Sequence, residues 1–495
     1  MRKLLLPLML AAALTGRTSS IDSLVGMKLR QQGVVPSPQC SDARLVRRLY
    51  LVTTDRIPTS DQVRSYLRDR NREALVDSLL ASEGFVEKMT LKWGDLLRIK
   101  SEFPSTHWPN AVQAYNKWLT DRFRANMPYD AFVRTLLLGT GSNFRVPETN
   151  IYRTGSDRAP ETQADNIALL FTGRRQAPPE WSVFFTQLRF KGTGEWKEEI
   201  LCLDIDVPAP ALPVRLAEGV SVKLREGTDY RVPFVEWLTS DANRPFARAM
   251  ANRMWFWFMG RGIVEPCDDM SPENAPSNAP LLEYLTDRFI ASGYDLHALA
   301  REILLSETFS RSSLSAGGNE ADSLWFSHYP LRRLTSEQLN DAVCDITGVP
   351  DLYSSRAPEP FTNYPAGTRA IQLGDGTVTT TQLELFGRPS RDLALESNRD
   401  NRLDSKQLLY LLNSTNVYDK LRTSPYLKSL SQRKLGVKGT VREIYLRVLG
   451  RPASDREVGA VTAWAAGLPQ RNRLRNMAES LMWALLNSDE FIFMN

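Results

Sequence analysis

Residues 251–278 read ANRMWFWFMGRGIVEPCDDMSPENAPSN, an aromatic block followed by two glycines and an acidic loop. If the block is helical, apolar side chains cover every face of it, and a helix that is apolar all round is buried. Gly260 and Gly262 provide the permissive backbone at which such a helix ends. An exposed platform for stacking sugars is the alternative, but it would leave a large aromatic area in water. The stretch therefore predicts a core helix centred on Trp255 and Trp257.

Helical patterns dominate the rest of the chain. Residues 42–52 and 111–124 carry apolar side chains at helical spacing. Between 181 and 232, short segments rich in β-branched and aromatic residues predict a small β insertion. LYLVTTDRIPTSDQV near 49–63 resembles IYLRVLGRPASDREV at 444–458, which indicates one reused helix–turn–helix element with Ser and Asp as caps. We predict a mainly α, multi-lobed helical protein with reused helix–turn–helix elements and a small β insertion.

A chain of 495 residues is too long to fold around one small hydrophobic core. Four parts are expected along the chain: a signal segment over 1–20, an N-terminal helical domain over 40–180, a small β insertion and linker over 181–232, and a C-terminal helical domain over 233–495.

Charge and rare residue types argue against several functional classes. The 62 Lys and Arg alternate with the 57 Asp and Glu instead of forming runs, so no nucleic-acid partner is expected. The three histidines are far apart, which disfavours a zinc site or a histidine-based catalytic pair. The four cysteines contain no CxxC pair, and both disulfides and free buried thiols stay open. With no phosphate loop, nucleophile elbow or HExxH motif, the sequence leans away from an enzyme.

The N-terminus, MRKLLLPLMLAAALTGRTSS, has the basic start, short apolar stretch and small residues of a secretory signal. The sequence around Leu14-Thr15-Gly16 resembles the approach to a bacterial lipoprotein cleavage site, but Arg17 stands where the lipidated cysteine would be. Natural drift and an engineered change would both explain that residue. No later segment is apolar enough for a transmembrane helix. We expect export to the periplasm or cell surface of a Gram-negative-type bacterium, with a lipid anchor excluded while residue 17 is Arg.

The acidic loop is the first candidate site, and its carboxylates are Glu265, Asp268, Asp269 and Glu273. Asp268 and Asp269, with Glu265, are candidate acid–base residues, as paired carboxylates are in glycosidases. Asp268, Asp269 and Glu273 are candidate ligands for calcium, although the regular alternation of known calcium loops is missing. We favour the simpler interpretation, in which these residues cap helices and pair with Arg253 or Arg261.

A second set of candidates is rich in arginine, whose planar guanidinium binds carboxylates and phosphates through two hydrogen bonds. The candidate ligand-binding residues are Arg261, Arg332, Arg333, Arg388, Arg391 and Glu396. Arg399 belongs to the same arginine cluster. The favoured interpretation is that these residues form buried ion pairs that tie loops to the helical body, with partners among Glu337, Glu384 and Glu396.

The segment KWGDLLRIK at 92–100 shows how packing and surface residues alternate along a helix. Helical spacing places Trp93, Leu96 and Leu97 inward. We interpret Asp95 and Arg98 as surface residues.

Several longer motifs carry a resemblance to a known family. NRMWFWFMGRGIVEPCDDM and PSNAPLLEYLTDRFIASGYDLHALAREILLSETF, followed by RRLTSEQLNDAVCDITG and FGRPSR, are similar to a domain of unknown function numbered 1553. RRLYLVTTDRIPTSDQVRSYL, nearer the N-terminus, resembles the domain numbered 1549. The two occur together in exported proteins of planctomycetes, verrucomicrobia and some Bacteroidetes, and the resemblance covers nearly all the mature chain. Some members carry cytochrome-like modules, which implies extracytoplasmic redox or polymer-processing settings.

The chain departs from that family at the positions that would bind metals or haem. Many relatives carry a CxxCH segment where this chain reads LLFTGRRQAPPEWSVFF, and others carry cysteines after FGRP, where this chain has none. A Pro-Ser-His-Pro segment is replaced by residues 276–279, PSNA. Since haem attachment and cluster ligation need those thiols and imidazoles, no cofactor is expected.

The sequence supports two hypotheses about function. The leading one is a non-catalytic, envelope-associated scaffold or binding component, exported from the cell, whose partner is a polysaccharide or an envelope protein. The alternative is an extracytoplasmic enzyme that acts on polymers through the acidic loop at 265–273.

Overall fold

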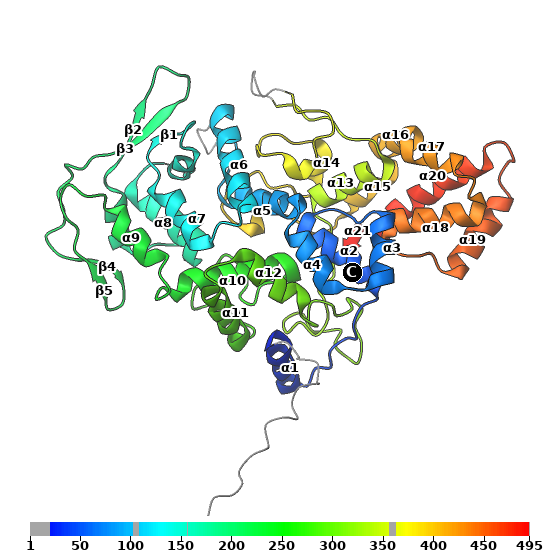
Figure 1. Ribbon diagram of the computed structural model, residues 1–495, viewed down its shortest axis with the longest axis horizontal. Helices are drawn as coiled ribbons and strands as arrows, with labels where there is room; N and C mark the ends of the chain where they lie inside the picture. Colours follow the sequence, from blue (N-terminus) through cyan, green and yellow to red (C-terminus); the bar gives the residue numbers. More distant parts are fainter. Residues whose placement is uncertain (1–19, 102–107, 156, 356–362, 495) are drawn as a thin grey trace, which may run out of the picture.

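The computed structural model of the protein describes residues 20–101, 108–155, 157–355 and 363–494 (Figure 1). These residues form 21 α-helices and only small sheets of two or three strands. The prediction of a mainly α protein with a small β insertion is therefore confirmed. The predicted signal segment at 1–20 lies outside the described residues, apart from Ser20.

In the first half of the chain, aromatic side chains of α5, α6, α7 and α8 pack together around Trp93. The helices of this half are α1 (Ser20–Gln32), α2 (Asp42–Thr54), α3 (Ser60–Asp69), α4 (Arg72–Leu80), α5 (Glu83–Leu96), α6 (Pro109–Arg124), α7 (Tyr129–Leu138), α8 (Pro160–Thr172) and α9 (Arg231–Leu238). Two 3₁₀ helices lie among them, η1 (Pro147–Arg153) and η2 (Pro179–Phe185).

The first helix of the second half, α10, contains the aromatic block. The helices of this half are α10 (Arg244–Met259), α11 (Ala279–Ala291), α12 (Leu296–Leu305), α13 (Ser336–Thr347), α14 (Thr381–Leu385), α15 (Ser405–Asn413), α16 (Thr415–Thr423), α17 (Pro425–Gln432), α18 (Gly436–Leu449), α19 (Asp455–Ala466), α20 (Arg473–Leu486) and α21 (Asp489–Ile492), with the 3₁₀ helices η3 (Ala370–Gln372) and η4 (Glu396–Asn398). Helices α18, α19 and α20 form a lobe at one end of the molecule (Figure 1).

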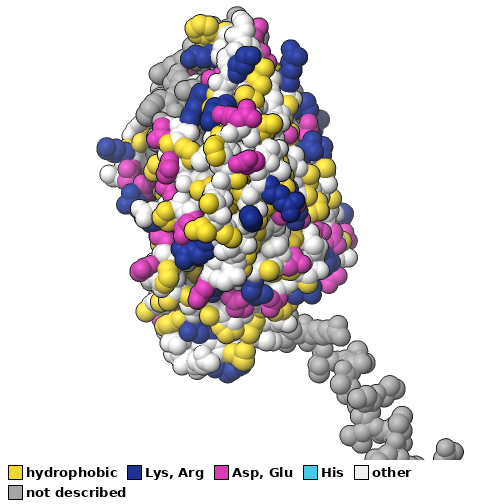
Figure 2. All heavy atoms as spheres, turned by 90° about the vertical axis from the view of Figure 1, so that its left-hand side faces the viewer, with side chains coloured by type: hydrophobic (Ala, Val, Ile, Leu, Met, Phe, Trp, Pro, Cys, Tyr) yellow, Lys and Arg dark blue, Asp and Glu magenta, His cyan; other side chains and the backbone are white. Residues whose placement is uncertain are grey.

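The predicted β insertion forms antiparallel strands at the opposite end (Figure 1). In one sheet β3 (Glu199–Leu203) lies between β1 (Gly141–Ser142) and β2 (Leu188–Gly192), and β4 (Val214–Ala217) pairs with β5 (Val220–Val222) in another. Figure 2 shows this end of the molecule, where charges of both signs are interspersed with apolar side chains. A last pair, β6 (Arg332–Arg333) with β7 (Phe493–Met494), joins the C-terminal end to the middle of the chain.

One continuous hydrophobic core runs from α1 to β7 and includes residues of both helical halves. The C-terminal segment returns to the centre, where the buried Arg47 of α2 donates hydrogen bonds to the carbonyl oxygens of Glu490, Phe491 and Phe493. Because these donors satisfy carbonyls that end a helix, they fix α21 against α2. No helix of the described residues is both long and apolar enough to cross a membrane.

The reused helix–turn–helix element is present at both predicted places. The C-cap residues of α2 and α18 are Asp55 and Gly450, each with left-handed backbone, and a capped helix follows in both cases. The caps are Thr59 before α3 and Ser454 before α19, each within a capping box. In the first copy the cap is Thr59 instead of the Ser or Asp that the sequence predicted, because the Thr59 hydroxyl accepts the N–H of Gln62.

Candidate functional site

The aromatic block forms α10, and its tryptophans belong to the core as predicted. Trp255 is fully buried and Trp257 is 2% exposed. The Trp255 ring packs edge-on against Phe326, with ring centroids 5.2 Å apart. Helix α10 ends at Gly260, whose φ of 77° lies in the left-handed region that favours glycine. A Cβ at Gly260 would lie 2.8 Å from the Arg332 side chain, which would have to shift to make room for it.

Asp268 points into the protein, where it joins a buried polar network. One carboxylate oxygen, Oδ1, accepts hydrogen bonds from Arg253 Nε (3.3 Å) and Nη2 (3.1 Å), and the other accepts the backbone N–H of Glu396 (2.6 Å). Glu396 in turn accepts from Trp257 Nε1 at 2.6 Å and pairs with Lys92 Nζ at 2.8 Å. Burial raises the pKa of Asp268 in spite of the Arg253 charge. The carboxylate is thus occupied by protein groups and enclosed away from solvent.

Asp269 turns the other way, toward a surface pocket of about 890 Å³. Its Oδ2 accepts from Arg175 Nε at 2.7 Å and its Oδ1 from the Ser271 N–H at 3.1 Å. Burial opposes ionisation, but the hydrogen bonds from Ser271 and Arg175 outweigh it and lower the pKa of Asp269. The exposed Glu273 also lines this pocket, together with Arg174, Arg175 and Arg248.

Glu265, in the same loop, is half-buried. It accepts the N–H of Gly262, and burial raises its pKa. The four loop carboxylates therefore diverge: Asp268 joins the core, Glu265 closes a turn, and Asp269 and Glu273 line the pocket. Asp268 accepts the N–H of Glu396 at the start of η4 and pairs with Arg253, which agrees with the favoured interpretation. Asp269 is not the cap of any described helix.

Among the described residues, no group of three or more His, Cys, Asp and Glu side chains is placed to hold a metal ion. All four cysteines are free thiols in this structure.

Because Asp268 lies in the core and Asp269 lines a surface pocket, we expect their substitutions to change the free energy of unfolding by different amounts. Asp268→Asn should lower the free energy of unfolding by about 1.5–3 kcal/mol, the usual contribution of hydrogen bonds to charged groups. The expected loss is smaller than for a fully ionised buried pair, because burial raises the pKa of Asp268 and disfavours its charged form. Asp269→Asn breaks an ion pair whose arginine is mostly exposed and should cost about 0–1 kcal/mol. Chemical denaturation of both variants measures the difference. Equal losses would show that the two carboxylates are not in different environments.

The arginine cluster forms a second buried network around Glu337, in the first turn of α13. Arg399 donates to Glu337 at 2.8 Å and pairs with Asp95 at 2.6 Å. Arg388 lies 3.5 Å from Glu337, and Arg391 pairs with Asp95 at 2.8 Å. The charges of Arg399 and Arg388 overcome the effect of burial and hold the pKa of Glu337 far below its usual range. These ion pairs tie the loop at 386–400 to α5 and α13.

Of the expected glutamate partners, Glu337 and Glu396 are paired in the buried networks. Glu384 is exposed and makes no ion pair with any described residue. Arg332 and Arg333 donate to backbone carbonyls instead of carboxylates. Arg332 binds the carbonyl oxygens of Trp257 and Phe258. Arg333 binds those of Leu334, Phe386 and Asp400. Arg261 is half-buried.

The interpretation of Asp95 as a surface residue is wrong. Trp93, Leu96 and Leu97 are buried as predicted, but Asp95 is buried too, since Arg391 and Arg399 reach it from a segment about 300 positions later. The charge is stable inside because two guanidinium groups compensate it.

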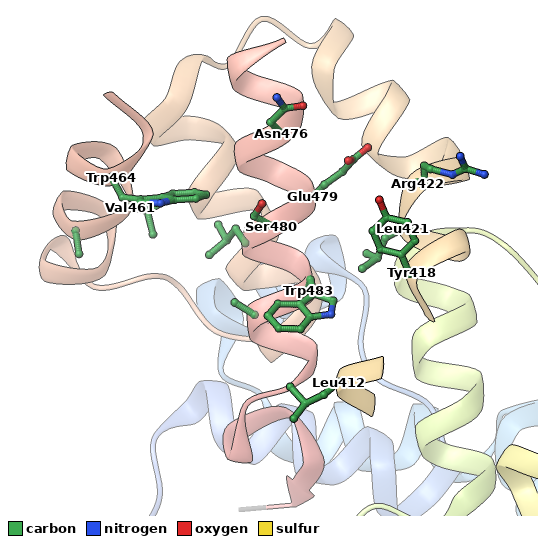
Figure 3. Close-up of a pocket in the computed structure, with 13 residues that line it drawn as sticks. Leu412, Tyr418, Leu421, Arg422, Val461, Trp464, Asn476, Glu479, Ser480 and Trp483 are labelled. Atoms are coloured by element: carbon green, nitrogen blue, oxygen red, sulfur yellow. The ribbon is translucent and has the colours of Figure 1, made fainter. Parts of the chain in front are cut away.

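A groove in the C-terminal lobe exposes the aromatic rings that the sequence did not single out. Its volume is about 880 Å³, and it lies between α15, α16, α19 and α20. Tyr418 is 60% exposed, Trp464 47% and Trp483 38%. Figure 3 shows Trp483 on α20, with Trp464 on one side of that helix and Tyr418 on the other. Leucine and valine side chains form the rest of its apolar wall: Leu412, Leu421, Val461 and Leu481.

Polar side chains lie beside these rings. Asn476, Glu479 and Ser480 come from α20, and Arg422 comes from α16 (Figure 3). Glu479 accepts a hydrogen bond from Arg475 at 3.0 Å, so its charge is compensated. A concave apolar surface with a few polar groups at its edge is the usual form of a binding site. Of the pockets described here, this groove combines the most exposed aromatic surface with hydrogen-bonding groups.

Two family models match the chain, one in each helical half. The family described as PSCyt2, protein of unknown function (DUF1549), matches residues 20–178, and the family described as PSD1, protein of unknown function (DUF1553), matches residues 230–465. No curated protein and no solved structure matches the chain. The buried networks join the two matched regions, since Lys92 and Asp95 belong to the first and Glu396 and Arg399 to the second. The chain therefore belongs to the family of proteins that pair these two domains of unknown function.

Proposed function

We propose that this protein is a non-catalytic, exported binding component of the cell envelope, and that it holds a polysaccharide in the aromatic groove of its C-terminal lobe. The observation that carries the proposal is the exposure of Tyr418, Trp464 and Trp483 around one groove. Soluble proteins rarely leave such an apolar surface uncovered unless it binds something. Export is proposed from the signal pattern at residues 1–20.

A sugar chain suits both kinds of side chain in the groove. The C–H faces of pyranose rings carry a partial positive charge and stack on aromatic faces, which carry a negative quadrupole. Hydroxyl groups of the same rings need donors and acceptors, and Asn476, Ser480 and Arg422 provide them beside Trp483. The groove volume of about 880 Å³ is large enough for a few sugar units.

The geometry of the acidic loop supports a binding function over the enzyme alternative. A glycosidase needs two carboxylates that reach the same bond of the substrate. Asp268 is 3% exposed and is held by Arg253 and a backbone N–H, whereas Asp269 lines a surface pocket. A substrate that contacts Asp269 would not contact Asp268.

The proposal predicts that two exposed tryptophans carry most of the affinity. In native gels containing soluble polysaccharides, both neutral and acidic, the mature protein should be retarded by at least one polymer. The double variant Trp464→Ala/Trp483→Ala should lose that retardation, because stacking on exposed aromatic rings provides the apolar part of the contact. Circular dichroism and thermal melts check that the variant is folded.

Trp196→Ala is the matched control, since Trp196 is 64% exposed but lies next to β3, at the opposite end of the molecule. This variant should migrate as the parent does in every gel. The proposal fails if no polymer retards the parent, or if the double variant is retarded as strongly as the parent. If no polysaccharide retards the parent protein, specific capture of an envelope protein by the same groove would show that the groove binds a protein partner instead.

A further inference from the structure

The C-terminal part of the chain, which includes the helices around the aromatic groove, carries a charge that the rest of the chain does not share. Residues 405–495 contain 14 Lys and Arg against 7 Asp and Glu, a formal charge of +7, whereas the whole chain carries +5. All other residues together therefore carry −2. The chain as a whole is nearly balanced, but residues 405–495, which include most of the aromatic groove, are strongly basic.

Several of these basic residues lie at the groove or next to it. Arg422 lines it, with its side chain 63% exposed, and its only ion pair with a described residue is a loose one of 3.6 Å with the exposed Asp419. Helix α20 begins with Arg473 and Arg475, directly before the groove residue Asn476. Arg475 compensates the single acidic side chain of the lining, Glu479.

We infer that the polymer in the groove is an anionic polysaccharide, whose sugar rings stack on Trp464, Trp483 and Tyr418 while its carboxylate or sulfate groups bind Arg422 and the start of α20. This inference rests on the proposed function. Arginine is well suited to the role because its guanidinium binds planar oxyanions through two hydrogen bonds. A local excess of positive charge also attracts a polyanion over distance and raises its association rate.

Two polymers with the same backbone separate the contribution of charge from that of stacking. Polygalacturonate carries one carboxylate on each sugar, and highly methyl-esterified pectin presents the same sugars with most carboxylates blocked. The parent protein should bind polygalacturonate about tenfold more tightly, the factor that corresponds to roughly one additional charge-assisted hydrogen bond. This preference should decrease in 0.5 M salt, because salt screens exposed charges.

Two charge-reversal variants show whether the preference for the anionic polymer depends on a residue at the groove. Arg422→Glu should remove the preference for polygalacturonate, because it weakens binding of that polymer far more than binding of the esterified polymer, whose rings still stack on Trp464 and Trp483. Lys191→Glu changes the net charge equally on the exposed surface of β2, far from the groove, and should keep the preference.

Each outcome of this comparison has a definite meaning. Equal binding of the two polymers, lost in Trp464→Ala/Trp483→Ala, would overturn the anionic preference and leave the proposed function standing. Binding of neither polymer or any other polysaccharide would overturn both. Equally tight, groove-dependent binding of a single-stranded polynucleotide would also overturn the inference, because bases stack on aromatic rings and phosphates bind arginine.

Discussion

Replacing Glu337 with glutamine should lower the free energy of unfolding by about 3–5 kcal/mol, the usual cost of removing one partner from a buried ion pair. Glu337 is fully buried and faces both Arg399 and Arg388. Arg399 would keep Asp95, but Arg388 would be left without a carboxylate partner among the described residues. Urea denaturation at neutral pH measures the loss.

Glu384→Gln is the matched control, because Glu384 is exposed and unpaired among the described residues. Its effect should stay within about 0.5 kcal/mol. The pKa of Glu337 is depressed in the folded protein, so its contribution to stability is complete above its ordinary value of 4.5 and is lost as the pH falls below it. Glu337→Gln should therefore lose less stability than the parent on acidification. A loss near that of Glu384→Gln would contradict the structural role given to this network.

Truncation of the buried tryptophans should lower the free energy of unfolding by as much as Glu337→Gln does. Trp255→Ala and Trp257→Ala should each cost about 3–5 kcal/mol, because each leaves a large cavity in the core. Trp257→Phe keeps most of the packing but removes the hydrogen bond to Glu396, and should cost about 1–3 kcal/mol. Thermal and urea unfolding measure these losses. Trp196→Ala, at an exposed position, controls for the loss of an indole ring, and core variants as stable as that control would contradict the assignment.

The sequence predicted the core helix because α10 has apolar residues on all of its faces. It did not predict the buried charges of α5, where Lys88, Lys92 and Asp95 form a single stripe at helical spacing. That regular spacing was a usable signal of a polar face. Their partners, Asp55, Glu396, Arg391 and Arg399, come from distant parts of the chain, and only the fold brings them together. Local pattern cannot distinguish a charge facing water from one facing a buried counter-ion.

The aromatic groove was missed for a related reason. Trp483 lies three and four positions after Ser480 and Glu479, on the polar face of α20, while Met477, Leu481 and Leu485 occupy the buried face. This spacing indicates an exposed tryptophan. The groove itself could not be predicted, because its other walls belong to α15, α16 and α19, and their arrangement depends on tertiary packing.

Hydrogen exchange with and without polygalacturonate tests most directly whether function resides in the groove. The account predicts slower exchange in the bound state for the backbone amides of segments 412–422 and 460–484, which line the groove, and unchanged exchange in the acidic loop at 264–276. Protection of the loop at 264–276, with the groove segments unchanged, would contradict the account and place the binding site at the pocket beside Asp269.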